Sequence, residues 1–382
     1  MQINYQQHSP RKEQQLLTYR KVGVDRFKAH SLRKAIAERL DQELQERRGP
    51  SPIKLPFGLV VPLSDSKKIF FDFQTEGVGT KTLLAELIGH YESIGVDGVA
   101  MAVNDVIRSG ARPILLSDCI HISKSSTKVI QGLIRGIIKA CGIAGCSLVS
   151  GETGIVPDIL HHPLSIDSNE SPFDLVVSCV GLVSSKNLIR GRIEEGDEII
   201  GVESSGIHSN GITLARRVLL KRWGGAFETY DKPLGRARTI VEELLIPTRI
   251  YSQPIMKILD SGLKPKAAIH ITGDGFAKFS RLSEYAGDKL GFRFELCERM
   301  PPIFGLIYEK ARARGNAISI EEMYRTFNMG YGFAIVSKKE DSDEFLQVLN
   351  KYFPSRKIGL VTAGRGIRIS GLKDTQRTII SL

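Results

Sequence analysis

The chain has 382 residues, of which 42% are hydrophobic and 25% are charged. This composition excludes collagen-like, mucin-like and disordered chains, and the length predicts about two domains. The 53 Lys and Arg residues outnumber the 42 Asp and Glu residues, which gives a formal net charge of +11. Such an excess favours phosphate-bearing ligands or nucleic acid. Because it is spread along the chain without a basic block, we do not expect nucleic acid to be the partner.

No stretch of the sequence is apolar enough and long enough to span a membrane, and the N-terminal stretch has no apolar leader. We therefore expect a soluble, cytoplasmic protein without membrane contacts. The five cysteines include no CxxC pair and no metal-finger spacing. We interpret them as small buried residues rather than as disulfides or metal ligands.

Residues 1–50 are predicted to form an N-terminal arm followed by a helix. Residues 1–30 are polar and aperiodic, whereas Leu32, Ile36, Leu40 and Leu44 recur every fourth residue. That spacing lines one face of a helix, and we expect it to end near residue 49.

The rest of the chain alternates helical and strand patterns. In chain order, we predict a strand at 68–75, helices at 82–91 and 99–109, a strand at 113–116, a helix at 128–143, strands at 147–149, 174–183 and 198–202, helices at 210–222 and 236–262, and strands at 332–337 and 357–370. A polar stretch at 184–187 is the best domain boundary. These patterns predict an α/β protein with mixed sheets, with one domain at 51–188 and a second at 189–382.

The first candidate site is the turn Thr75-Glu76-Gly77-Val78-Gly79-Thr80-Lys81, between a predicted strand and a predicted helix. Its glycines would let backbone N–H groups approach a phosphate, next to the positive end of the helix. Lys81 is a point charge for phosphate oxygens, and Glu76 is a candidate metal ligand. A simple strand-to-helix turn explains the same glycines.

Four carboxylates, Glu76, Asp105, Asp118 and Glu152, lie at predicted strand and helix ends within one half of the chain. Hard oxygen ligands of this kind suit Mg²⁺ that bridges nucleotide phosphates. Each carboxylate taken alone is equally well explained as a solvated cap.

Two further loops combine polar side chains with glycines directly after apolar runs. Residues 204–211 read Ser-Ser-Gly-Ile-His-Ser-Asn-Gly, and residues 270–275 read His-Ile-Thr-Gly-Asp-Gly. Hydroxyl, amide and imidazole groups in one loop are able to bind phosphate and transfer a proton near neutral pH. Residues 322–328, Glu-Met-Tyr-Arg-Thr-Phe-Asn, are interpreted as packing.

These clusters, in their order, resemble the phosphoribosylformylglycinamidine cyclo-ligases, also called AIR synthetases. The resemblance spans about residues 19–370. It rests on Tyr19–Asp25, Gly77-Val-Gly-Thr-Lys81, Gly95–Asp105 with Gly110-Ala-Arg-Pro113, Gly151-Glu-Thr153, Ser204–Gly211, Leu245–Tyr251, His270-Ile-Thr-Gly273 and Glu322–Asn328.

The resemblance implies a two-domain subunit in a homodimer, whose N-terminal domains join their sheets into a β-barrel across the two-fold axis. It also implies ATP and Mg²⁺. The family's reaction is the ATP-dependent ring closure of formylglycinamidine ribonucleotide to aminoimidazole ribonucleotide in purine biosynthesis. In that reaction ATP phosphorylates the formamide oxygen, an amidine nitrogen attacks the activated carbon, and phosphate leaves.

Residue roles carried over from the resemblance fall into four groups. Nucleotide binding is assigned to Gly77, Gly79, Thr80, Lys81, Asp105 and Gly151, metal binding to Glu76, Asp105, Asp118 and Glu152, substrate binding to Ser205, His208, Thr272 and Gly273, and catalysis to Lys81, His208 and Asn210.

The chain departs from the family pattern at three places. Glu76 replaces an aspartate, Asp274 replaces a glycine and should repel phosphate, and the glycine-rich segment that closes over ATP is here a proline-rich stretch at 49–58 that retains Phe57-Gly58. An alternative is therefore a paralogue that activates another amide with ATP, or a diverged binding or regulatory protein.

Overall fold

The computed structural model describes residues 16–25 and scattered positions between 28 and 43. It also describes residues 51–161, 171–235, 237–296, 300–313, 315, 317–373 and 376–382. Side chains are not described at 371–373 and 376–379. The first 15 residues of the predicted arm, together with Leu40, Leu44, His162 and Cys297, lie outside this part of the chain.

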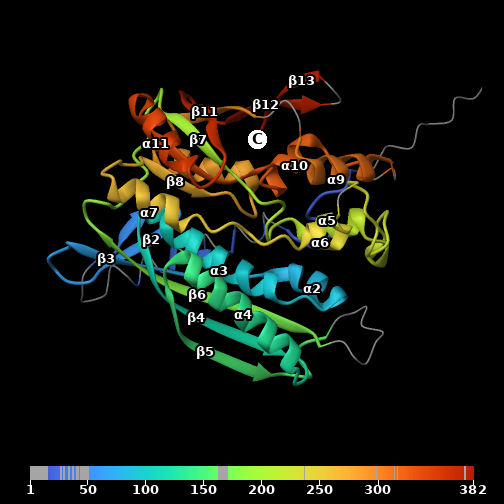
Figure 1. Ribbon diagram of the computed structural model, residues 1–382. Helices are drawn as coiled ribbons and strands as arrows, with labels where there is room; N and C mark the ends of the chain where they lie inside the picture. Colours follow the sequence, from blue (N-terminus) through green and yellow to red (C-terminus); the bar gives the residue numbers. More distant parts are fainter. Residues whose placement is uncertain are drawn as a thin grey trace, which may run out of the picture.

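A six-stranded mixed sheet forms the first half of the protein (Figure 1). Strands β4 and β5 are parallel, and the other neighbouring pairs are antiparallel. In spatial order the strands are β1 (Ile53–Leu55), β2 (Gly58–Pro62), β3 (Ile69–Gly77), β6 (Phe173–Ser184), β4 (Arg112–Ile122) and β5 (Ser147–Ile155).

One face of this sheet is covered by two helices, α3 (Glu92–Val106) and α4 (Thr127–Ala144) (Figure 1). Along β6, buried residues alternate strictly with partly exposed ones, as expected for a sheet with one covered face. The two helices approach closely because Gly95 and Gly136 face each other. A Cβ at Gly136 would lie 2.0 Å from the Glu92 carbonyl oxygen, so only glycine fits there.

Among the described residues, no helix covers the opposite face of the sheet (Figure 1). The apolar side chains of Ile69, Phe71 and Phe73 on β3, and of Leu115 on β4, are exposed there. Phe73 is 61% exposed, an unusual value for a phenylalanine in the middle of a strand. Within one chain this face is an open sheet surface.

A seven-stranded sheet forms the second half, above α3 and α4 in Figure 1. Only β12 and β9 pair in parallel in this sheet. In spatial order the strands are β13 (Gln376–Ser381), β12 (Ile367–Lys373), β9 (Leu290–Glu295), β11 (Ser355–Ala363), β7 (Glu198–Glu203), β10 (Tyr331–Ser337) and β8 (Ala267–His270).

The remaining helices are short and lie mainly in the second half of the chain. They are α2 (Thr82–Ile88), α5 (Ile212–Leu219), α6 (Ile240–Leu244), α7 (Ser252–Asp260), α8 (Ser280–Tyr285), α9 (Pro302–Ala313), α10 (Ile320–Thr326) and α11 (Ser342–Leu349). Among the described helices, none is long and apolar enough to cross a lipid bilayer.

The predicted α/β class with mixed sheets is confirmed, and so are its most periodic elements. Helix α4 begins and ends within one residue of the prediction, and its register residues Val129, Leu133 and Ile137 are buried. The single helix predicted at 236–262 is wrong: α6 and α7 are separated by an extended segment at 245–251 that contains Pro247. The strand predicted at 113–116 is much longer, because polar residues alternate with buried ones as far as Ile122.

The predicted N-terminal helix is partly described. The described positions between 28 and 43 adopt helical backbone, and Leu32 and Ile36 are 58% and 59% exposed. These two members of the predicted apolar stripe therefore do not pack on the core.

Candidate functional site

Helix α3 is buried between the two sheets and presents three polar side chains to the C-terminal half. Asn104 lies seven residues and Asp105 eight residues after Asp97. This spacing of about two helical turns places the three side chains on one face of the helix. Asp97 Oδ1 accepts hydrogen bonds from the backbone N–H of Thr248 (2.8 Å) and from its hydroxyl (2.6 Å). Asn104 Oδ1 accepts one from the N–H of Tyr251 (2.9 Å). These contacts join the two halves of the chain.

Asp105 lies at the centre of a cluster of charged groups. Its Oδ1 lies 2.7 Å from His270 Nδ1, and its Oδ2 lies 2.8 Å from an Arg108 Nη2. Burial alone would raise the pKa of Asp105, but Arg108, Lys278 and the hydrogen bond from His270 together hold that pKa below its usual value. Asp105 is therefore a buried carboxylate that is shared between a helix of the first half and a strand of the second.

Glu76 places a second carboxyl group beside Asp105. It stands at the end of β3 and is partly buried. Burial and the negative charge of Asp105 raise the pKa of Glu76 to about 7, although Lys278 and Arg108 act in the opposite direction. Two carboxyl groups and two cations thus share one buried space, and the carboxylate oxygens are of the kind that divalent cations prefer.

Lys278 reaches this cluster from the C-terminal half. It is 5% exposed, and its Nζ donates to the His270 carbonyl oxygen (2.9 Å) and to Thr272 Oγ1 (2.8 Å). Burial and the nearby Arg108 lower the pKa of Lys278 to about 8, although Asp105 raises it. The lysine is thereby fixed to the predicted substrate loop while it faces the two carboxyl groups.

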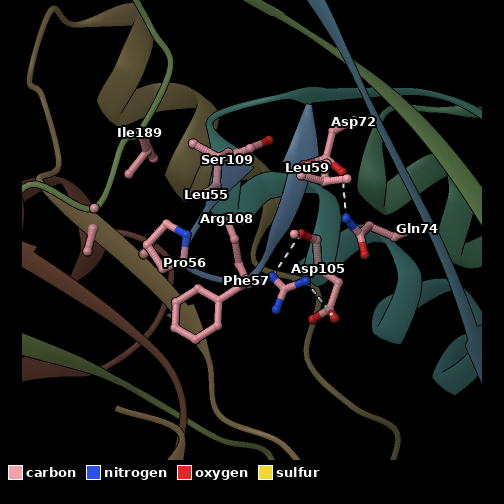
Figure 2. A pocket seen from close by; sticks show the side chains of 14 residues that line it. Leu55, Pro56, Phe57, Leu59, Asp72, Gln74, Asp105, Arg108, Ser109 and Ile189 are labelled. Atoms are coloured by element: carbon pink, nitrogen blue, oxygen red, sulfur yellow. Dashed lines mark hydrogen bonds and ion pairs between the residues drawn. The ribbon is translucent and has the colours of Figure 1, made fainter. Parts of the chain in front are cut away.

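Phe57 covers the two cations of the cluster. The guanidinium carbon of Arg108 lies 5.4 Å from the centre of its ring, and Lys278 Nζ lies 5.7 Å from it. Figure 2 shows the ring beside Arg108, in a pocket that also contains Asp105. The retained Phe57-Gly58 pair of the proline-rich segment thus closes over the charged site, through contacts typical of cation–π interactions.

Lys81 does not face this cluster. Its side chain is completely buried, its Nζ lies 2.7 Å from an oxygen of Asp97, and it donates to the Ile246 carbonyl oxygen (2.8 Å). Asp97 is eight residues from Asp105, about 12 Å along the helix. Lys81 therefore ties the two halves together here, in contrast to the phosphate contact predicted from the motif.

The glycine turn next to Lys81 also borders the C-terminal half. Gly79 has a φ of +70°, a conformation that favours glycine. The hydroxyl of Thr80 lies 2.8 Å from that of Thr213. Gly77 ends β3 directly after Glu76. The nucleotide contacts assigned to Gly77, Gly79 and Thr80 stay a prediction.

Asp118 and Gly151 lie opposite each other on β4 and β5, in the row of the sheet that also contains Glu76. A Cβ at Gly151 would lie 2.7 Å from Asp118 Oδ1, so glycine is required beside this buried carboxyl group. Burial raises the pKa of Asp118. A strand separates Asp118 from Glu76, and Glu152 is exposed.

The four predicted metal ligands are therefore not gathered into one site within this chain. In the part of the chain that the structure describes, no three His, Cys, Asp or Glu side chains are placed to hold one metal ion. Glu76 and Asp105 are brought together, whereas Asp118 and Glu152 lie further along the sheet. The intervening strand β6 separates Asp118 from Glu76, and Glu152 points to the opposite face of the sheet because it directly follows Gly151 in β5.

The loop at 204–211 holds His208 in a buried position. Its Nε2 accepts a hydrogen bond from the Ser205 N–H (3.2 Å), and its backbone φ is +62°. Its Nδ1 has no hydrogen-bond partner among the described residues. Burial and the neighbouring His270, together with Lys81, hold the pKa of His208 well below its usual value. His208 is therefore a neutral imidazole with an unused N–H group.

The two predicted substrate loops meet at Gly273. A Cβ at Gly273 would lie 3.1 Å from Asn210 Oδ1, so the loops are in close contact. Asp274 lies 3.1 Å from a nitrogen of Arg281. The expected repulsion of phosphate by Asp274 is therefore offset by a neighbouring cation.

The segment at 322–328 was interpreted as packing, and its last residue supports the 204–211 loop directly. Asn328 Oδ1 accepts from the Ser204 hydroxyl (3.0 Å), and its Nδ2 donates to the carbonyl oxygens of Gly206 (2.9 Å) and Ile207 (3.2 Å). Ser205 donates through its hydroxyl to Pro247 (2.5 Å). The loop backbone is thus fixed from two sides.

Sequence reasoning missed four residues of the site: Asp97, Arg108, His270 and Lys278. Arg108 follows Asp105 by one helical turn, so the spacing itself signals an ion pair. His270 was noted within its motif but received no role. Lys278 lies six residues beyond Thr272 in a short helical turn, and no local pattern predicts that it points at the carboxyl groups.

Comparison with known proteins identifies the family to which the chain belongs. Residues 59–183 match the family model "AIR synthase related protein, N-terminal domain", and residues 194–371 match its C-terminal counterpart. A phosphoribosylformylglycinamidine cyclo-ligase of Pyrococcus furiosus is 38% identical over 92% of this chain and 97% of its own length. The chain belongs to the phosphoribosylformylglycinamidine cyclo-ligase family. The cyclo-ligase of Methanocaldococcus jannaschii is 31% identical over 96% of this chain and 97% of its own length.

Solved structures show the same fold in more distant proteins. HypE in a complex with HypF matches with a TM-score of 0.57 at 16% identity, over 85% of this chain and 92% of that chain. Thermotoga maritima PurL complexed with ATP matches with a TM-score of 0.52 at 17% identity, over 85% of this chain and 44% of that chain. At these identities the likeness establishes the fold of this cyclo-ligase family member and nothing about its ligands.

Glu76 makes the stability of the protein depend on pH. The fold favours its protonated form, so this contribution is complete below pH 4.5 and is lost as pH rises through about 7. Without added divalent metal, wild type should lose about 3 kcal/mol of unfolding free energy between pH 4.5 and 8 relative to Glu76→Gln. Urea unfolding across this range measures it. Glu284→Gln, which removes an exposed carboxyl group, should keep the wild-type slope, and an equal slope in Glu76→Gln would contradict the assignment.

Proposed function

We propose that this protein converts formylglycinamidine ribonucleotide and ATP into aminoimidazole ribonucleotide, ADP and phosphate. The observation that carries the proposal is the cluster between the two halves of a cyclo-ligase family member. Glu76 and Asp105 approach it from the N-terminal half, and Thr272 and Lys278 approach it from the C-terminal half. A reaction that transfers a phosphoryl group from a nucleotide to an amide oxygen needs two binding surfaces that meet at one point.

The chemistry is a phosphoryl transfer followed by a ring closure. The bond from the γ-phosphorus of ATP to its bridging oxygen breaks as the formyl oxygen of the substrate attacks, and ADP leaves. An amidine nitrogen then attacks the activated carbon and loses a proton to solvent, and the carbon–oxygen bond breaks. Phosphate departs with the former formyl oxygen, which solves the problem that an amide oxygen is a poor leaving group.

The N-terminal half would bind ATP. Gly77, Gly79 and Thr80 offer backbone N–H groups at the start of a helical turn, directly beside Glu76. Two of the solved structures with this fold, PurL and HypE, are complexes with ATP. We extend ATP binding to this chain on the strength of its family. Gly151 would contribute by its close approach to Asp118.

Mg²⁺ fits the carboxyl pair by its chemistry. Glu76 and Asp105 offer carboxylate oxygens in one buried space, which are the ligands that Mg²⁺ prefers, and a bound cation would favour the ionised form of Glu76. Glu76 and Asp105 would hold the ion, with Asp118 proposed as an outer carboxylate on the same face of the sheet, whereas Glu152 points to the opposite face. When bound, Mg²⁺ supplies charge neutralisation for the phosphate groups.

The C-terminal half would hold the substrate. Thr272, Gly273 and Asn210 meet where the two loops touch. His208 is a neutral imidazole, and the hydrogen bond from the Ser205 N–H keeps its ring in place within the loop. The buried, hydrogen-bonded loops would exclude water from the reacting carbon.

The test is a coupled assay of ADP and aminoimidazole ribonucleotide with purified protein, Mg²⁺, ATP and formylglycinamidine ribonucleotide. Wild type should form the two products one to one. Asp105→Asn should lower kcat by about 100-fold, because it removes a charge that holds His270 and Arg108 in place. Glu284→Gln should match wild type. ADP release without aminoimidazole would contradict the proposal.

We also propose a homodimer in which two N-terminal sheets join into a barrel. The open face of the sheet supports this, because Phe71, Phe73 and Leu115 are exposed in the single chain. We divide the chain into an arm at 1–50, a dimerisation and ATP domain at 51–188 and a substrate domain at 189–382. The two sheets and the two matched family segments support this division.

A charge on the open sheet face should break the dimer. Phe73→Glu places a carboxylate at the centre of the proposed interface, and burying it unpaired is costly. Light scattering after gel filtration should give the mass of a dimer for wild type and of a monomer for this variant. Tyr230→Glu, at an equally exposed aromatic of the other half, should stay dimeric. A wild-type monomer would contradict the dimer.

A further inference from the structure

Lys278 is a buried cation whose charge is not matched by an ion pair. Its two hydrogen-bond partners, the His270 carbonyl oxygen and Thr272 Oγ1, are both neutral. Within the described part of the chain no carboxylate forms an ion pair with it, although Asp105 and Glu76 act on it over a longer distance. Burying an ammonium group in this way is costly, so its retention calls for an explanation.

Arg108, the other cation of the cluster, is already bound to Asp105. Its Nη2 lies 2.8 Å from Asp105 Oδ2, and its Nε donates to the Asp105 carbonyl oxygen (2.9 Å). Lys278 has three N–H groups, and its two hydrogen bonds use two of them. Lys278 is therefore the cation of this cluster with a donor to spare.

The position of Lys278 is defined from two sides. Thr272 fixes the ammonium group to the proposed substrate loop, and Phe57 of the N-terminal half lies over it at 5.7 Å. Asp105, on the proposed nucleotide side, lies close by, because its Oδ1 is 2.7 Å from Nδ1 of His270, the residue whose carbonyl oxygen Lys278 binds. Lys278 thus stands between the two proposed binding surfaces, where a group that passes from one to the other would meet it.

We propose that Lys278 is a catalytic residue that binds the phosphoryl group during its transfer from ATP to the formyl oxygen of the substrate. This inference rests on the proposed function and adds a residue to it. Lys278 stays protonated throughout and donates its spare N–H to a non-bridging phosphoryl oxygen. It neither gains nor loses a proton, because the electron pair of the broken phosphorus–oxygen bond leaves with ADP.

The chain allows a matched set of variants. Lys278→Gln keeps N–H donors for the His270 carbonyl and Thr272 but removes the charge, and Lys278→Met removes both. Lys278→Arg keeps the charge. Lys289→Gln is the control, because Lys289 is an exposed lysine in the same half of the chain. Each full-length protein is assayed for kcat of aminoimidazole formation, for Kd of Mg²⁺-ADP and for its melting temperature.

We expect Lys278→Gln to lower kcat by about 100-fold while the Kd of Mg²⁺-ADP changes less than about threefold, because the contact exists only during transfer. Lys278→Arg should recover about tenfold of that loss, and Lys289→Gln should match wild type. This split between kcat and ADP affinity separates a catalytic role from a structural one.

Four results would overturn the proposal. A folded Lys278→Gln variant with a kcat close to that of wild type would show that Lys278 does not contact the phosphoryl group during its transfer. A parallel loss of ADP affinity means that Lys278 shapes the nucleotide site instead. Failure of both neutral variants to fold means that the lysine is structural. Wild type that forms no aminoimidazole overturns the proposed function and this inference together, whereas the other three results leave the proposed function standing.

Discussion

Helix α3 must bury Asp97, Asn104 and Asp105 on one face, and the rest of the structure depends on how that is achieved. A buried carboxylate or amide is stable only when it is hydrogen-bonded or paired. The N-terminal half supplies Lys81 and Arg108, and the remaining partners come from the C-terminal half. The two halves are therefore held in one relative position by buried polar contacts, which are more exacting in geometry than apolar packing.

The same constraint places the chemistry. Because Asp105 is shared with His270, the substrate loops of the C-terminal half are brought to the end of β3, where Glu76 adds a second carboxyl group. The carboxyl groups of Glu76 and Asp105 then lie close to Lys278, which has one N–H group without a partner among the described residues. Phe57 covers this lysine. The carboxylate oxygens of Glu76 and Asp105 suit a metal-bound nucleotide. The buried ammonium group of Lys278 suits a phosphoryl group during its transfer.

The sequence predicted the class of fold and most of the site loops, because strand and helix periods and glycine turns are local signals. It also grouped Glu76 with Asp105, and the two carboxyl groups do lie close together, while their shared role in metal binding stays a prediction. It did not predict that Lys81 would be buried against Asp97, since a glycine turn followed by lysine is compatible with a phosphate site or with a buried ion pair inside the domain. Lys278 was missed because its approach to Asp105 depends on the docking of two domains, and Asp118 was grouped with Glu76 because strand order cannot be read from strand pattern.

The central claim is that phosphate carries away the formyl oxygen of the substrate, and isotope transfer tests it most directly. Formylglycinamidine ribonucleotide labelled with ¹⁸O in its formyl group is converted by the protein with unlabelled ATP in unlabelled water, and the inorganic phosphate is examined by mass spectrometry. The account predicts one ¹⁸O atom in each phosphate formed with aminoimidazole. Unlabelled phosphate, with its new oxygen taken from water, would contradict it.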